Sequence, residues 1–266
     1  MSLSKQLLVS IFCCIYLFSN LAIAQNANLK VVDSLELQAD AFIGIDKFQN
    51  LYYIKNNSVI KKTENGEIMA FQDFQLGDIS RVDILNPNKI TVFYKWSNVV
   101  IILDNRMTEI KRQDFNNLSP FINVSYAGTS KDQSLWIYNI DLNQLELYDY
   151  RFDKSIAKST PINQEVLGMK NNFNLCYLQT DDGVLVFNIY GSLVKHLRIN
   201  DIKTIDLFKN QLLVYANDEI KIFDKDFNLK HSLKTDKLDG KNIFYNDENL
   251  YIYDGNKVFI YSIHSK

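Results

Sequence analysis

Acidic and amide side chains alternate at Asp224-Lys-Asp-Phe-Asn228, which is how a calcium-binding loop begins. A calcium loop of the EF-hand type also needs a glycine at its sixth position and a bidentate glutamate at its twelfth. Leu229 and Thr235 stand at these positions instead. Asp and Asn side chains also accept hydrogen bonds from the backbone two residues later, and so they start tight turns. We therefore expect Asp224 to begin a turn rather than to bind an ion.

Residue types that serve as catalysts or metal ligands are few and widely spaced. The three histidines, His196, His231 and His264, do not form a cluster with metal-ligand spacing. The sequence has no serine-nucleophile elbow, phosphate-binding glycine loop or His-Glu-x-x-His motif. Cys176 is the only cysteine after residue 24, and its apolar neighbours predict a buried side chain. These observations predict no cofactor and give no support for a familiar catalytic site.

A short apolar phrase recurs along the chain at intervals of 37 to 45 residues. A nearly fixed period of this length indicates a repeat architecture. The phrase is rich in aromatic and β-branched residues, and no segment after residue 24 has a sustained helical period, so each copy is predicted to be a strand. The six copies are Leu51-Tyr-Tyr-Ile54, Ile90-Thr-Val-Phe93, Leu135-Trp-Ile-Tyr138, Leu175-Cys-Tyr-Leu178, Leu212-Leu-Val-Tyr215 and Leu250-Tyr-Ile-Tyr253.

Each repeat resolves into four short strands, here called A to D, and the phrase is strand B. In the first repeat the predicted strands are residues 42–45, 51–54, 59–62 and 68–71. Strands B and C are apolar on both faces, as in a sheet covered on both sides, whereas D is more polar, as at an exposed edge. Strand C often ends in a residue that can start the next turn: Asp104, Asp149, Asn188 and Asp224.

Six such units predict an all-β fold, a six-bladed β-propeller of four-stranded antiparallel blades with the A strands around the axis. The alternative is a solenoid, which would need polar capping repeats at both ends. The sixth repeat stops after strand C, whereas residues 29–37 form an extra strand before the first repeat. We expect this N-terminal strand to complete the last blade and close the ring. The predicted blades are residues 39–76, 77–120, 121–164, 165–200, 201–238 and 239–266 with 29–37.

The end of strand C and the turn after it resemble a known family of propellers. Ile222-Phe-Asp224 and Val186-Phe-Asn188-Ile-Tyr-Gly191 are similar to the repeat unit of secreted six-bladed propellers of the NHL and YWTD type. The resemblance covers residues 25–266 and implies a ring of six blades. The Tyr-Trp-Thr-Asp phrase itself is absent. The resemblance therefore implies the fold, and it assigns no functional residue.

The first 24 residues have the features of a secretory signal peptide. Lys5 supplies positive charge, residues 7–18 are an apolar core, and Ala22-Ile-Ala24 is a cleavage site. The alternative is an uncleaved anchor helix, but a bilayer span needs roughly 20 apolar residues, so this core is short. We expect residues 25–266 to be one exported domain without an integral membrane span. Its expected place is the periplasm, the outer membrane surface or the exterior of a Gram-negative bacterium.

The charge of the predicted exported domain argues against a nucleic-acid partner. Removing Lys5 leaves 29 − 1 = 28 basic residues against 31 acidic residues, a net charge of −3. Binding to nucleic acid requires a strongly positive surface. We therefore expect another protein or a component of the cell envelope as the partner.

Turns between strands B and C carry several charged residues on the face where propellers usually bind ligands. An acidic rim there could attract a cation or a basic protein surface. The alternative is that acidic residues are common there because they form turns. Trp96 is a candidate interface anchor, or else it packs on the adjacent strand ends. The candidate binding residues are Lys55, Trp96, Asp141, Asp181, Asp182, Asp218, Glu219 and Asp254.

Three hypotheses about function follow. The first is a non-catalytic module that binds a protein or an envelope component, with an accessory subunit of an outer-membrane or secretion assembly as a close variant. The second is a propeller enzyme of the lyase, lactonase or hydrolase type with a metal on the axis, and the third is a binder of a small cation or sugar. Oxygen ligands for an axial metal would come from the A strands, at Asp46, Asp83, Asp206 and Asn242.

Overall fold

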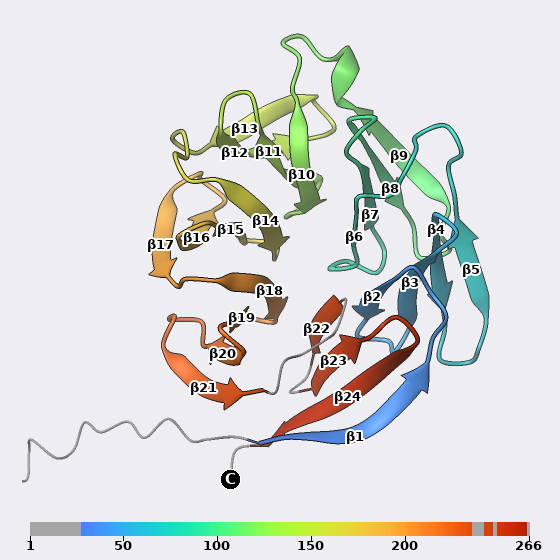
Figure 1. The fold of residues 1–266 in the computed structure, drawn as a ribbon. Coiled ribbons are helices and arrows are strands. Elements are labelled where there is room, and N and C mark those ends of the chain that lie inside the picture. Colours follow the sequence, from blue (N-terminus) through green and yellow to red (C-terminus); the bar gives the residue numbers. More distant parts are fainter. Residues whose placement is uncertain (1–27, 236–241, 247–248, 265–266) are drawn as a thin grey trace, which may run out of the picture.

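The computed structural model describes residues 28–235, 242–246 and 249–264, which form a closed ring of six blades (Figure 1). Each blade is a sheet of four antiparallel strands, and only the short 3₁₀ segment η1 (Phe115–Asn117) is helical within the described residues. The predicted six-bladed β-propeller is confirmed. The described residues contain no helix that is long and apolar enough to span a membrane. The predicted signal peptide lies outside the described residues.

The strands follow one another from the axis to the rim in every blade. Blade 1 comprises β2 (Ala41–Ile45), β3 (Leu51–Lys55), β4 (Ser58–Lys62) and β5 (Ile68–Phe71). Blade 2 comprises β6 (Arg81–Asp83), β7 (Ile90–Tyr94), β8 (Val99–Leu103) and β9 (Glu109–Asp114). Blade 3 comprises β10 (Val124–Thr129), β11 (Ser134–Asn139), β12 (Gln144–Asp149) and β13 (Lys154–Lys158).

The remaining blades repeat this order, and the last one draws on both ends of the described chain. Blade 4 comprises β14 (Val166–Asn171), β15 (Leu175–Thr180), β16 (Gly183–Asn188) and β17 (Leu193–Arg198). Blade 5 comprises β18 (Ile202–Phe208), β19 (Gln211–Ala216), β20 (Glu219–Phe223) and β21 (Leu229–Lys234). Blade 6 comprises β22 (Asn242–Asn246), β23 (Asn249–Tyr253), β24 (Lys257–His264) and β1 (Asn28–Glu36).

The ring closes through β1, as predicted. β1 runs antiparallel to β24, with register from Asn28 opposite His264 to Glu36 opposite Lys257. Figure 1 shows β1, in blue, beside β24, in red, at the outer edge of the last blade. The first and last described strands of the chain therefore share one sheet. Opening the ring would require this whole ladder to separate.

Apolar residues are buried between the blades, which explains why most residues of strands B and C are apolar on both faces. Every residue of β7 and β8 is buried, whereas β5 and β13 alternate between partly buried and exposed residues. Phe115 of the loop after blade 2 packs against Tyr148 of blade 3, with ring centroids 5.1 Å apart. Cys176 is buried as predicted, and desolvation raises the pKa of its thiol.

Asx turns follow strand C, as predicted. Oδ1 of Asp224 accepts hydrogen bonds from the backbone N–H groups of Asp226 and Asn228, both at 2.9 Å. Asp104 accepts from the backbone in the same way, as do Asp149 and Asn188. The calcium-like string at Asp224 is therefore a turn whose carboxylate binds its own backbone.

Six residues, one from each A strand, form a layer across the axis. Each of them pairs with the second residue of the repeated phrase in strand B, so the six residues are equivalent by register. They are Gly44, Asp83, Gly128, Asn171, Asp206 and Phe244. Two of the six are glycines, and a Cβ on either would overlap a neighbour: the ring of Phe244 at Gly44, and Oδ1 of Asn171 at Gly128. The glycines therefore make room for larger side chains near the axis.

Candidate functional site

The ring has two different ends, because the strands of each blade alternate in direction. The B–C turns and the loops between blades lie at one end, here called the loop face. The A–B and C–D turns lie at the other end, here called the turn face. The candidate binding residues predicted from the sequence belong to the loop face, and the candidate metal contributors belong to the A strands.

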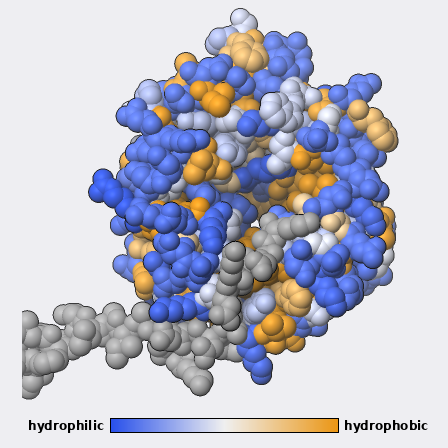
Figure 2. Space-filling model, in the orientation of Figure 1, coloured by the Kyte–Doolittle hydropathy of each residue, from blue (hydrophilic) through white to orange (hydrophobic). Residues whose placement is uncertain are grey.

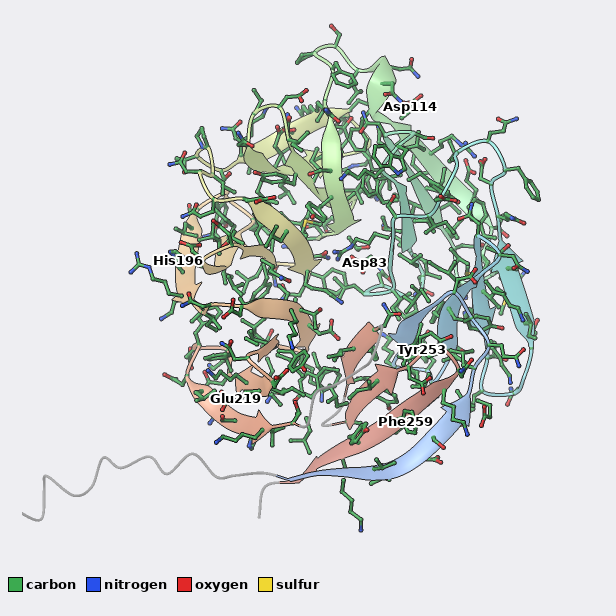
Figure 3. The ribbon with its side chains drawn as sticks, viewed as in Figure 1. Asp83, Asp114, His196, Glu219, Tyr253 and Phe259 are labelled. Carbon is green, nitrogen blue, oxygen red and sulfur yellow. The ribbon has the colours of Figure 1, made fainter. Side chains whose placement is uncertain are left out.

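The eight candidate residues of the loop face are distributed over all six blades. Lys55 ends β3 and is exposed, whereas Glu219 is the first residue of β20 rather than part of the turn before it. The others lie in B–C turns: Trp96 in blade 2, Asp141 in blade 3, Asp181 and Asp182 in blade 4, Asp218 in blade 5 and Asp254 in blade 6. Figure 3 shows His196 and Glu219 toward the periphery, away from Asp83 near the axis. The acidic residues therefore do not converge on one ligand.

Two of these acids accept hydrogen bonds that organise the loops around them. Oδ1 of Asp254 accepts hydrogen bonds from the backbone N–H groups of Asn256 and Lys257, both at 2.8 Å. These two bonds hold the pKa of Asp254 below its ordinary value. Oδ1 of Asp141 accepts from Nδ2 of Asn123 at 3.0 Å, which joins the turn to the loop before it.

Other acids are paired with bases of the same blade. Asp218 lies 2.7 Å from Nζ of Lys203, and Glu219 lies 3.2 Å from Nζ of Lys221. Oδ1 of Asp182 lies 3.3 Å from Nε2 of His196. Lys203 and Lys221 neutralise their partners, and His196 does so when it is protonated, so these acids are occupied within the protein rather than free to recruit a cation.

Trp96 is almost fully exposed, which decides between an interface anchor and an indole packed on the adjacent strand ends. Its side chain is 84% exposed, and Nζ of Lys95 lies 5.8 Å from the centroid of its ring. An indole packed on strand ends would be largely buried. Trp96 therefore presents its ring to the surroundings at the loop face.

Four further large apolar residues accompany Trp96 on the loop face, and the sequence did not single them out. Phe74 lies in the loop between blades 1 and 2 and is 87% exposed. Phe121 lies in the next inter-blade loop, and Ile140 and Leu142 lie in the B–C turn of blade 3; all three are exposed. We call Phe74, Trp96, Phe121, Ile140 and Leu142 the apolar loop cluster. These residues occupy consecutive loops, and aromatic residues are enriched at protein interfaces.

Hydrogen bonds join the loops that carry the first three members. Oγ of Ser97 donates to the backbone carbonyl of Leu76 at 2.6 Å, which ties the turn of Trp96 to the loop of Phe74. Nδ2 of Asn98 donates to the carbonyl of Ile122 at 2.8 Å, which ties the same turn to the loop of Phe121. The turn that carries Trp96 is therefore bonded to the inter-blade loops on both sides of it.

Further bonds connect these loops to blade 3 and to the outer strand of blade 2. The backbone N–H of Ile140 donates to the carbonyl of Asn123 at 3.0 Å. At the other end, Nη2 of Arg112 lies 2.8 Å from Oδ2 of Asp73, the residue before Phe74. Burial raises the pKa of Asp73, but the hydrogen bonds from Arg112 and from the backbone of Gln75 outweigh it, so the pKa lies below its ordinary value. The loops of the cluster are therefore organised before any partner arrives.

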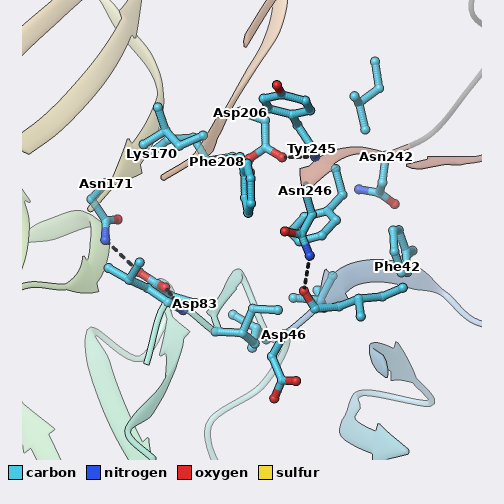
Figure 4. A pocket seen from close by; sticks show the side chains of 18 of the residues that line it. Phe42, Asp46, Asp83, Lys170, Asn171, Asp206, Phe208, Asn242, Tyr245 and Asn246 are labelled. Carbon is cyan, nitrogen blue, oxygen red and sulfur yellow. Dashed lines mark hydrogen bonds and ion pairs between the residues drawn. The ribbon is translucent and has the colours of Figure 1, made fainter. Parts of the chain in front are cut away.

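A second feature lies on the axis, where the ring encloses a cavity of about 420 Å³. Asp46, Asp83, Asp206 and Asn242 all line it, so the structure brings the four candidate metal contributors to one space. Figure 2 shows the ring hollowed at its centre, and Figure 4 shows these side chains around the cavity. Volumes of about 300–1,000 Å³ are typical of sites for small ligands.

The carboxylates of this cavity are already satisfied by donors of the protein. Oδ2 of Asp206 accepts from the backbone N–H of Tyr245 at 2.7 Å, and Oδ1 accepts from Nζ of Lys170 at 2.7 Å. Asp83 accepts from the backbone N–H of Thr129 and from Nδ2 of Asn171, both at 2.9 Å. These bonds join different blades across the axis, so the carboxylates have a structural role there.

Asp46 is satisfied within its own blade. Its Oδ1 accepts from the backbone N–H groups of Phe48 and Asn50, and its Oδ2 accepts from Nδ2 of Asn50 and from the hydroxyl of Tyr52. No group of three or more potential ligands with metal-site geometry occurs in the described ranges. A cation on the axis would have to displace these donors.

Comparison with known proteins identifies the fold. The chain matches no protein-family model and no curated protein. A chain in the crystal structure of the mitotic checkpoint complex is similar with a TM-score of 0.63 at 9% identity, over 92% of this chain and 95% of that one. The β-propeller domain of Cps50 (Swd1) from Myceliophteria thermophila is similar with a TM-score of 0.60 at 9% identity, over 89% of this chain and 100% of that one.

A bacterial protein is also similar. BamB from Moraxella catarrhalis matches with a TM-score of 0.50 at 13% identity, over 86% of this chain and 74% of that one. At these identities the likeness shows the architecture alone. The chain therefore has the β-propeller fold, which supports many functions.

Proposed function

We propose that this protein is an exported, non-catalytic β-propeller that binds another protein or a component of the cell envelope through its loop face. The apolar loop cluster is the observation that carries the proposal. Large aromatic side chains are enriched at protein interfaces and cost little conformational entropy on binding. Here Phe74 and Trp96 are nearly fully exposed on hydrogen-bonded loops.

The organisation of these loops favours recognition over a structural role. A binding surface that is ordered in the free protein avoids the entropic cost of ordering it on association. The bonds of Ser97, Asn98 and Arg112 supply that order without burying the rings themselves. The apolar cluster also gives a defined contact area, whereas most of the acids on this face are paired or held in turns.

The compartment and the assembly are part of the proposal. The predicted signal peptide supports export, and an accessory subunit of an outer-membrane or secretion assembly is the role we favour. One of the similar structures is a chain of the mitotic checkpoint complex, so a propeller of this fold occurs there within a protein complex. A place within a protein assembly is proposed for this propeller too.

Affinity purification from detergent-solubilised envelopes tests the proposal. The tagged wild-type protein is compared with a Phe74→Ser/Trp96→Ser variant and with a Phe152→Ser/Tyr190→Ser variant. Phe152 and Tyr190 are exposed aromatics of C–D turns on the opposite, turn face, so they make a matched control. We expect a stoichiometric partner with the wild type and the control and its loss with the loop-face variant. Recovery of the protein alone, or retention of the partner by the loop-face variant, would contradict the proposal.

A further inference from the structure

We propose that the axial cavity is a binding site for a small organic anion with a flat apolar body, such as an aromatic carboxylate. The site is separate from the apolar loop cluster and does not depend on the function proposed for it. Its walls come from the A strands of five blades and the turns that follow them. The proposal rests on the charges of these walls, on their free donors and on their aromatic content.

Charged residues of both signs line the cavity. The acids, Asp46, Asp83 and Asp206, are buried, and their oxygens accept hydrogen bonds from the protein. Lys47 and Lys209 are exposed, so Lys170 and Arg81 are the cations beside which an anion would bind.

Lys170 supplies the donor that can reach a ligand. Its ammonium group uses one of its three N–H bonds on Oδ1 of Asp206, at 2.7 Å, and the side chain remains 37% exposed. Figure 4 shows Lys170 and Asp206 together at the edge of the cavity. Because Asp206 fixes the ammonium group in place, a carboxylate that binds it gains a preorganised, charge-assisted contact.

Arg81 adds a second cation to the same wall. Its Nη2 donates to Oδ1 of Asn171 at 2.9 Å, and it lies 4.0 Å from Oδ2 of Asp83. Its Nε is buried and makes no hydrogen bond to any described residue. Asp83 also accepts a hydrogen bond from the backbone N–H of Thr129. Arg81 therefore places a second positive charge on the same wall, paired with Asp83.

Aromatic residues supply a surface for the body of the ligand. Phe42 and Phe244 meet edge to face with ring centroids 5.9 Å apart, and Phe208 and Tyr245 do so at 5.8 Å. All four line the cavity, but Phe42 and Tyr245 are buried, so Phe208 and Phe244 present the accessible ring surface. Such rings prefer offset or edge contacts with another aromatic group. Aromatic walls with one cationic edge match an amphipathic anion better than they match a sugar or a bare inorganic ion.

Isothermal titration calorimetry with naphthoate tests the site, with naphthalenemethanol and naphthylmethylamine as the neutral and cationic analogues. We expect naphthoate to bind with an affinity at least about tenfold higher than either analogue. No detectable binding of naphthoate, or equal binding of naphthoate and the neutral alcohol, would overturn the proposal.

Three variants locate the binding. Lys170→Met is expected to weaken the affinity for naphthoate by about tenfold. Lys170→Arg is expected to keep an affinity within about threefold of the wild type, because the arginine keeps the charge. Asn242→Trp fills the cavity without removing a cation and is expected to abolish binding. Full binding by Asn242→Trp would overturn the proposal even where Lys170→Met fails to fold. Loss of naphthoate binding in Trp96→Ala would also overturn it, because it would place the ligand on the loop face.

Discussion

Nδ2 of Asn171 donates a hydrogen bond to Oδ2 of Asp83 at 2.9 Å and so joins blade 4 to blade 2 past the strand that lies between them. The same amide donates to the carbonyl of Thr129 in blade 3 at 2.7 Å, and the backbone N–H of Thr129 donates to Asp83. Three consecutive blades therefore meet at one buried carboxylate. Gly128 makes this junction possible, because it is the equivalent position of the blade in the middle.

We predict that Gly128→Ala destabilises the protein by about 1–3 kcal/mol, as overpacking of a dense interior does. A Cβ there would overlap Oδ1 of Asn171 and lie 3.0 Å from Oδ2 of Asp83. The free energy of unfolding in urea measures the effect. Gly168→Ala is the matched control in β14, because its Cβ would meet no atom closer than 3.4 Å. Equal losses of stability in the two variants would show that the junction does not depend on Gly128.

Acidification is predicted to weaken the ion pair between Arg112 and Asp73. The pKa of Asp73 is lowered in the folded protein, so the ion pair contributes fully to the free energy of unfolding above the unfolded pKa of about 3.9. This contribution is lost as the pH falls through the lower pKa of the folded protein. Arg112 is 40% exposed, so screening by water limits the expected cost of Arg112→Gln at pH 7 to about 0.5–1 kcal/mol.

Urea unfolding of the wild type and of Arg112→Gln, at neutral pH and at a pH below the folded pKa of Asp73, measures this contribution. The difference between the two proteins is expected to disappear in acid. Lys62→Gln is the control, because Lys62 is an exposed lysine at the end of β4. A difference that persists in acid would show that Arg112 stabilises the protein by packing rather than by pairing.

The two tryptophans are predicted to differ sharply in their access to a quencher. Trp96 is 84% exposed, whereas Trp136 is 1% exposed in the interior of blade 3. Acrylamide should quench one component of the fluorescence strongly, and Trp96→Phe should remove that component with a change in stability within about 0.5 kcal/mol. A single, weakly quenched component in the wild type would show that Trp96 is covered.

Cys176 is predicted to be inert in the folded protein. It is fully buried, and burial raises the pKa of its thiol, so little thiolate forms and a reagent cannot reach it. For protein that begins after residue 24, an aryl disulfide reagent should react with one thiol only after unfolding in guanidinium. Rapid reaction without denaturant would contradict the closed ring.

Most of the fold could be predicted from the repeat in the sequence. Strands B and C are apolar on both faces because blades cover them on both sides, so their period and their turns were visible as one recurring phrase. The end strand that closes the ring was also visible, because the sixth repeat lacks its fourth strand. Register then links the phrase to the axis, since Thr91 pairs with Asp83 and Cys176 pairs with Asn171.

The site was only partly visible in the sequence. Trp96 stood out because tryptophan is rare in this chain, but Phe74 and Phe121 resemble the many phenylalanines that fill the core. Only their place in loops, beyond the ends of D strands, separates them from core residues. The cations of the axial cavity could not be grouped either, because Lys170 and Arg81 belong to different blades and meet only when the ring is closed.

Photo-crosslinking in living cells tests whether the protein binds its partner through the loop face. A benzoylphenylalanine replaces Phe74 in one protein and Phe152, on the turn face, in another, and adducts are compared after irradiation. Both positions are exposed, so the substitution itself should leave the fold intact. We expect a discrete adduct with another protein from position 74 and none of that mass from position 152. An adduct of the same mass from both positions, or from position 152 alone, would contradict it.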